Sequence, residues 1–109
     1  MDAREAIVTR RSVREYNSKS LGTGIIEEII GAGRYAPSSG NIQTWKVIVI
    51  TDEKMRDNIA SISMKQNWIS QAPVLLVVCG DKTMLESYYD KRGDKYCTQN
   101  VAAAVENML

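Results

Sequence analysis

A short basic segment near the N-terminus has the residue types that bind phosphate. In Arg10-Arg11-Ser12-Val13-Arg14, an extended backbone would place the first, third and fifth side chains on one side, because strand side chains alternate. Guanidinium groups bind phosphate oxygens through paired hydrogen bonds, and a serine hydroxyl adds a further donor. A solvated charged edge, a nuclear-localisation signal and a nucleic-acid patch are the alternatives, and no interleaved aromatic residues support the last.

Two further segments carry side chains that could read the polar edge of a heteroaromatic ligand. The loop 37–45 (PSSGNIQTW) combines a proline, a glycine and several small hydrogen-bonding side chains. The same pattern describes a structural turn whose Ser and Asn side chains bond to their own backbone. Gln66 is a weaker candidate, since its amide could bind such an edge or lie at the surface.

Several kinds of chemistry are excluded by composition. The chain of 109 residues has no histidine, so it cannot by itself form a Ser-His-Asp or Cys-His hydrolase. Cys79 and Cys97 are too far apart for a zinc knuckle or a CxxC pair, and we expect buried thiols in a reducing compartment. No metal site is expected. Any reaction must use a cofactor, Lys, Arg or carboxylate groups, or a partner chain.

Length and charge indicate one small domain, 1–109, in an aqueous compartment. The 14 Lys and Arg residues nearly balance the 13 Asp and Glu residues, which gives no support to general nucleic-acid or membrane binding. The longest apolar run, Val74–Cys79, is too short to span a bilayer, and the N-terminal stretch has no apolar signal core. We therefore expect a cytoplasmic protein without nucleic-acid or membrane partners.

The elements that must position the candidate residues follow from apolar periodicity. Helices are predicted at 2–9, 23–37, 52–62 and 96–109. Asp2 and Asp52 are the predicted caps of two of them. Strands are predicted at 45–50 (WKVIVI) and 74–79 (VLLVVC), and their nearly continuous apolar sequence indicates cover on both faces. The segment RRSVREY is predicted to be extended.

Taken together and in this order, these segments resemble the FMN-dependent nitroreductase family. The resemblance is carried by the RRSVR opening, the APSSGNIQTW loop, Gln66 followed by Ala72-Pro73 before a strand, and the YCTQNVAAAVENML helix. It implies an α+β fold with a mixed sheet sandwiched between helices, and an obligate homodimer with FMN at the interface. The chain would cover about the N-terminal half of that domain, so the domain 1–109 would be incomplete.

The resemblance also implies which residues bind FMN. Arg10, Arg11 and Ser12 would hold the phosphate and the ribityl chain, Arg14 the flavin pyrimidine at N1/O2, and Gln66 the edge at N3/O4. The opposite subunit would contribute four residues of the loop: Pro37, Ser38, Ser39 and Asn41. No residue is expected to be catalytic itself, because the flavin carries the chemistry.

The implied reaction is hydride transfer from NADH or NADPH through flavin N5 to a nitroaromatic, quinone or related small-molecule acceptor. Such transfer needs no side-chain nucleophile, which accords with a chain without histidine. Two alternatives stay open. One is a different flavin reaction, such as reductive dehalogenation or flavin fragmentation, and the other is a truncated, non-catalytic chain.

The sequence departs from the family pattern at two positions and in length. Thr44 stands where proline is usual, which should alter the turn but leave Gln43 and Trp45 in place. Asn100 stands where aspartate is common, so we expect a charge at a helix start to be lost. Family members continue for a comparable further stretch, which supplies a strand, a glycine-containing segment near flavin N5 and a late basic phosphate contact. We therefore expect the site in residues 1–109 to be incomplete.

Overall fold

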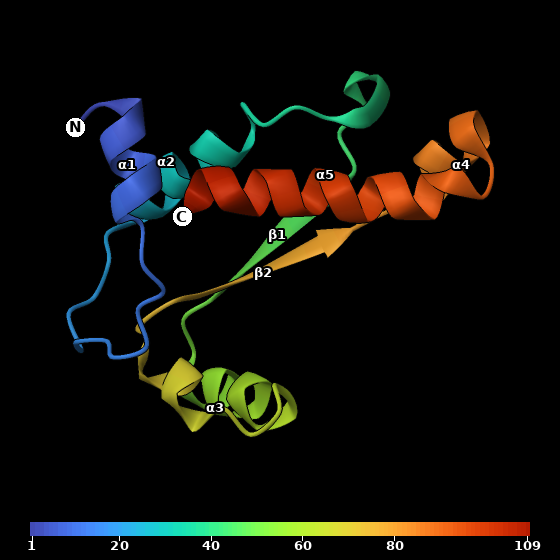
Figure 1. The fold of residues 1–109 in the computed structure, drawn as a ribbon. Coiled ribbons are helices and arrows are strands. Elements are labelled where there is room, and N and C mark those ends of the chain that lie inside the picture. Colours follow the sequence, from blue (N-terminus) through green and yellow to red (C-terminus); the bar gives the residue numbers. More distant parts are fainter.

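The computed structural model describes residues 1–109, which form an α+β fold (Figure 1). Its elements are α1 (Ala3–Thr9), α2 (Thr23–Gly33), a 3₁₀ turn (Ser39–Asn41), β1 (Trp45–Ile50), α3 (Glu53–Ile62), a second 3₁₀ turn (Asn67–Gln71), β2 (Leu75–Gly80), α4 (Thr83–Tyr89) and α5 (Arg92–Met108). The long helix α5 crosses the molecule, with α1 near one end and α4 at the other (Figure 1). The expected α+β class is confirmed.

Two helices begin where the sequence predicts a cap. Asp2 accepts a hydrogen bond from the Glu5 amide at 2.7 Å, and Asp52 accepts one from the Met55 amide at 2.9 Å. These side chains satisfy backbone donors that lack a partner within the first turn of a helix. The helix predicted to reach residue 37 ends at Gly33 instead, because the next three amides bond three residues back in tight turns.

The C-terminal helical region is longer than predicted. It contains α4, which was not predicted, and α5 begins at Arg92 rather than near residue 96. Gly93 explains how the two helices meet: a Cβ at this position would lie 2.5 Å from the Glu86 nitrogen, so only glycine fits. Close backbone approach of this kind is a typical use of glycine.

The two strands pair antiparallel, with Trp45 opposite Gly80 and Ile50 opposite Leu75. Helix α5 contacts both strands on one face, and α2 packs beside α5. Asn107 on α5 donates a hydrogen bond to the Ala32 carbonyl of α2 at 3.2 Å. These contacts give the sheet one covered face, on which Trp45 begins β1.

The other face of the sheet is open over most of its length, although Ile50 at the end of β1 is buried on it. Ile48 is 54% exposed there, and Cys79 is also exposed. The prediction that both faces of the strands are covered is therefore wrong for residues 1–109, because α2 and α5 pack on the same side. The expectation of buried thiols is confirmed for Cys97 and wrong for Cys79, which lies on the open face beside Lys46 of β1.

The molecule is less compact than its size predicts. Its accessible surface is 8263 Å², whereas a folded chain of this mass typically exposes about 6,000 Å². The radius of gyration is 15.5 Å against about 13 Å for a compact domain of this length. Few side chains, among them Leu85 and Ala104, are fully buried. None of the helices is long and apolar enough to cross a bilayer.

Candidate functional site

The basic segment Arg10–Arg14 lies in irregular chain between α1 and α2. Arg10 leaves α1 with φ −52° and ψ 133°, which is extended, but the segment pairs with no strand. Arg11 folds back, and its Nη1 donates to the carbonyl oxygens of Val8 at 3.2 Å and Arg10 at 2.8 Å. Part of the Arg11 guanidinium is therefore already engaged by the backbone.

The remaining positive charge of this segment is available to an anion. Both ion pairs in the structure are formed by Lys82, so no carboxylate pairs with Arg10 or Arg14. Both arginines are exposed, and Ser12 beside them is exposed as well. The segment thus has the unpaired guanidinium groups that phosphate binding requires.

Trp68 joins the basic segment to the chain around Gln66. The Arg14 guanidinium lies over the Trp68 ring, 5.9 Å from its centroid. The Tyr16 ring stacks on Trp68 with a centroid distance of 6.2 Å and an interplanar angle of 24°. A cation at this distance from an indole face is attracted by the ring quadrupole. Arg14 and Gln66, far apart in sequence, are therefore held in the same region.

Gln66 itself follows a strained piece of backbone. Met64 and Lys65 both have φ of 56°, in the left-handed region that residues with a Cβ rarely occupy. The Gln66 Nε2 donates to the Ser63 carbonyl at 3.1 Å, which leaves its Oε1 as an acceptor. Strained backbone of this type tends to occur at ligand sites.

The turn 37–41 lies against α5. Gly40 and Asn41 have φ of 61° and 57°, and a Cβ on Gly40 would come within 2.7 Å of the Tyr89 hydroxyl. Ser39 donates two hydrogen bonds to Oδ1 of Asn100 on α5, from its amide at 2.9 Å and from its hydroxyl at 3.1 Å. The turn is therefore anchored to a helix that follows it by sixty positions in the sequence.

Asn100 is a residue whose role the sequence did not reveal. Its Nδ2 lies 3.5 Å from the Thr44 hydroxyl, and the two side chains are 4% and 5% exposed. Thr44 and Asn100, the two positions at which we expected a departure from the family pattern, are thus in contact with each other. The expectation of a lost charge at a helix start is wrong, because Asn100 lies in the middle of α5. Gln43 stays beside the turn, with its Nε2 3.4 Å from the Ser38 hydroxyl.

The candidate residues form two groups in one chain. Arg14 and the Gln66 segment belong to the first, through Trp68. The turn 37–41 and Asn100 belong to the second. In Figure 1 the turn lies above α5, on the side of α4. The chain 10–22 lies below α1, at the other end of α5. One chain therefore does not bring the two groups together.

The sequence profile of the Nitroreductase family matches residues 7–70, a stretch that includes every candidate position from Arg10 to Gln66. The chain belongs to the nitroreductase family. The resemblance seen in the sequence is thereby confirmed.

Relatives and solved structures agree with this assignment. The chain is 34% identical to a protein of Archaeoglobus fulgidus provisionally named an NADH dehydrogenase/NAD(P)H nitroreductase, over 94% of this chain and 56% of that protein. It is 34% identical to the FMN reductase (NAD(P)H) of Bacillus subtilis over 79% of this chain and 36% of that protein. Its fold is similar to NfrA2 of B. megaterium, with a TM-score of 0.87 and 22% identity, over 99% of this chain and 49% of that one. The chain spans about half the length of the curated relatives it matches.

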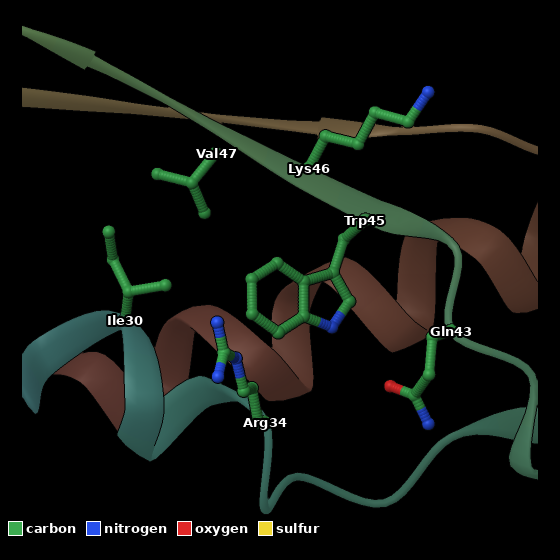
Figure 2. Close-up of a pocket in the computed structure, with 6 residues that line it drawn as sticks. All are labelled: Ile30, Arg34, Gln43, Trp45, Lys46 and Val47. Atoms are coloured by element: carbon green, nitrogen blue, oxygen red, sulfur yellow. The ribbon is translucent and has the colours of Figure 1, made fainter. Parts of the chain in front are cut away.

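This nitroreductase chain also has an open hollow of about 470 Å³ between α2 and β1 (Figure 2). Its lining residues are Ile30, Arg34, Gln43, Trp45, Lys46 and Val47. Figure 2 shows Arg34 reaching toward the Trp45 ring, whereas Lys46 points away from it. Trp45 is half-buried and forms a wall of this hollow.

The shifted pKa values of this nitroreductase chain belong to the start of α4. A hydrogen bond from the Thr83 amide holds the pKa of Asp81 below its usual value. Hydrogen bonding to Glu86, with the nearby charge of Asp94, raises the pKa of Lys82. These groups lie at the start of α4, where Lys82 pairs with Asp94 of α5, and they are not among the candidate binding residues.

Proposed function

We propose that this chain forms part of an FMN-dependent NAD(P)H oxidoreductase that reduces nitroaromatic, quinone or related acceptors. Membership of the nitroreductase family and the name of its B. subtilis relative, an FMN reductase, support FMN as the cofactor. When bound, FMN supplies the redox chemistry, accepting a hydride from NADH or NADPH at N5 and passing two electrons to the acceptor.

The polar groups of the candidate residues match the parts of FMN that they would bind. The unpaired guanidinium of Arg10, with Ser12, suits the phosphate, and the free nitrogens of Arg11 add to it. Arg14 offers a fixed positive charge to the pyrimidine edge, where it would favour the reduced, anionic flavin. The free Oε1 of Gln66 can accept a hydrogen bond from the flavin N3–H.

The contact of Arg14 with Trp68 is the single observation that carries this proposal. It brings a phosphate-binding segment and an amide that can read a ring edge into one region, although they are far apart in the sequence. A solvated charged edge would not need an aromatic residue from another segment beneath its guanidinium. The contact therefore favours ligand binding over the alternative of a charged surface.

We further infer a homodimer in which the second subunit contributes Pro37, Ser38, Ser39 and Asn41. The separation of the turn from the basic segment within one chain supports a shared site (Figure 1). The large accessible surface, 8263 Å², supports the need for a covering partner. Two unpaired cysteines favour a reducing compartment, and we propose the cytoplasm.

Flavin occupancy tests the proposal directly. We expect the purified protein to be yellow or to take up added FMN, to quench its fluorescence and to release it on denaturation. Arg14→Ala should weaken FMN binding by about tenfold or more, because a charge-assisted hydrogen bond is typically worth about 1.5–3 kcal/mol. Colourless protein that takes up no FMN, with its mass verified, would contradict the proposal.

The second candidate is a chain that binds flavin weakly or not at all and does not turn over substrate alone. The open sheet face, with Ile48 54% exposed, favours this candidate. NAD(P)H oxidation measured with and without a quinone acceptor distinguishes the two, since only the first candidate gives acceptor-dependent turnover.

A further inference from the structure

The buried amide of Asn100 is the side chain of α5 that hydrogen-bonds to the turn 37–41. It is 4% exposed, and a buried amide is costly unless its donor and acceptor groups are satisfied. Oδ1 accepts both bonds from Ser39, at 2.9 and 3.1 Å, and Nδ2 lies 3.5 Å from Thr44 Oγ1. All of its hydrogen bonds to other segments thus go to the two sides of one loop.

Apart from Asn100, the hydrogen bonds that hold the turn come from its own loop, including the one from Gln43 to the Ser38 hydroxyl at 3.4 Å. Within it, Asn41 bonds to the Ser38 carbonyl at 3.1 Å and Ile42 to the Ser39 carbonyl at 3.2 Å. Two of its residues, Gly40 and Asn41, have left-handed backbone conformations that need support from their surroundings. Residues outside the loop form no other hydrogen bond with Ser39. The position of Ser39 therefore depends on Asn100.

The chemistry of the contact also orients the Ser39 hydroxyl. Its hydrogen is directed to Asn100 Oδ1, so its lone pairs are left for a donor on the solvent side. An open hollow on that side is lined by Pro37, Ser38 and Ser39 together with residues of α5. Asn100 thereby determines which hydrogen-bonding groups the turn presents.

We propose that Asn100 is the positioning residue of the cofactor-binding turn, and that Thr44 is its matched partner. This inference rests on the proposed function, since it gives Asn100 a role in flavin binding without contact to the flavin. Thr44 has the hydroxyl that an asparagine amide can use, and a proline at this position would have none.

Three variants test the role. Asn100→Leu keeps the number and branching of the side-chain heavy atoms and removes the hydrogen bonds. Asn100→Asp keeps the acceptor for Ser39. Asn107→Leu is the matched control, because Asn107 lies on the same helix and also donates across to another element, at Ala32 of α2. The readouts are FMN affinity, the exchange rate of the Ser39 amide and stability in urea.

We expect Asn100→Leu to weaken FMN binding about tenfold, since both hydrogen bonds from Ser39 are lost, and to speed exchange of the Ser39 amide by about tenfold. Asn100→Asp should stay within about threefold of the wild type in both. Asn107→Leu should lower stability and leave FMN affinity and Ser39 exchange unchanged.

Two results would overturn the positioning role. One is wild-type affinity in Asn100→Leu, and the other is an equal loss of affinity in Asn107→Leu, which would mean general destabilisation. Ser39 exchange tests the anchor without any flavin, and an unchanged rate in Asn100→Leu and Asn100→Asp alike overturns it. Wild-type protein that binds no FMN while Ser39 exchange responds to Asn100→Leu overturns the proposed function and leaves Asn100 a purely structural anchor.

Discussion

At the scale of single residues, Trp68 supports two side chains of the N-terminal segment at once. Arg14 lies over its ring and Tyr16 stacks on it. We expect Trp68→Leu to weaken FMN binding about two- to fivefold, because an exposed cation–π contact is worth about 0.5–1 kcal/mol. Fluorescence titration measures the change. Trp68→Phe, which keeps an aromatic face, should recover most of the affinity, and equal affinities in both variants would contradict the role.

The sequence identified the candidate donors one by one, but not their neighbours. Arg14, Ser39 and Gln66 were singled out because guanidinium, hydroxyl and amide groups have readable chemistry. The roles of Trp68 and Asn100 were not predicted, because an aromatic or amide side chain acquires its role only from a contact with a distant segment.

At the scale of elements, the sequence predicted the helices and strands with clear apolar periodicity and missed α4. The strand 45–50 is observed as predicted, and the aspartate caps of α1 and α3 are confirmed. The start of α5 was missed because residues 92–95 (RGDK) have no apolar face and include glycine, a poor helix former. Its helical state depends on contact with α4.

Gly93 makes that contact testable. Gly93→Ala should lower the free energy of unfolding by about 1–3 kcal/mol, because the added methyl group would meet the backbone of Glu86 at 2.5 Å. Gly31→Ala in α2 is the control: nothing lies within 4 Å of its Cβ position, so it should stabilise by about 0.5–1 kcal/mol. Urea unfolding measures both, and similar effects in the two variants would contradict the packing argument.

At the scale of the whole molecule, the apolar strand sequences predicted that both faces of the sheet are buried, and a single chain does not bury both. The strand sequences indicated burial on both faces, and the structure covers only the side of α2 and α5. The pattern reports how much surface a strand tends to bury, but not which polypeptide buries it. Hence the fold class was predictable, whereas the openness of the molecule was not.

The exposed surface makes the stability of this chain depend on association. If a second copy covers part of the 8263 Å², the folded state gains free energy with protein concentration, and the melting temperature must rise. We expect a measurable rise over about a hundredfold range of concentration, with light scattering giving the mass of a dimer at the upper end. FMN should raise the melting temperature further, because the cofactor would bridge Arg14 of one copy and the turn 37–41 of the other. A monomer at every concentration, with a constant melting temperature, would contradict the shared site, since the two groups of candidate binding residues lie apart in each chain.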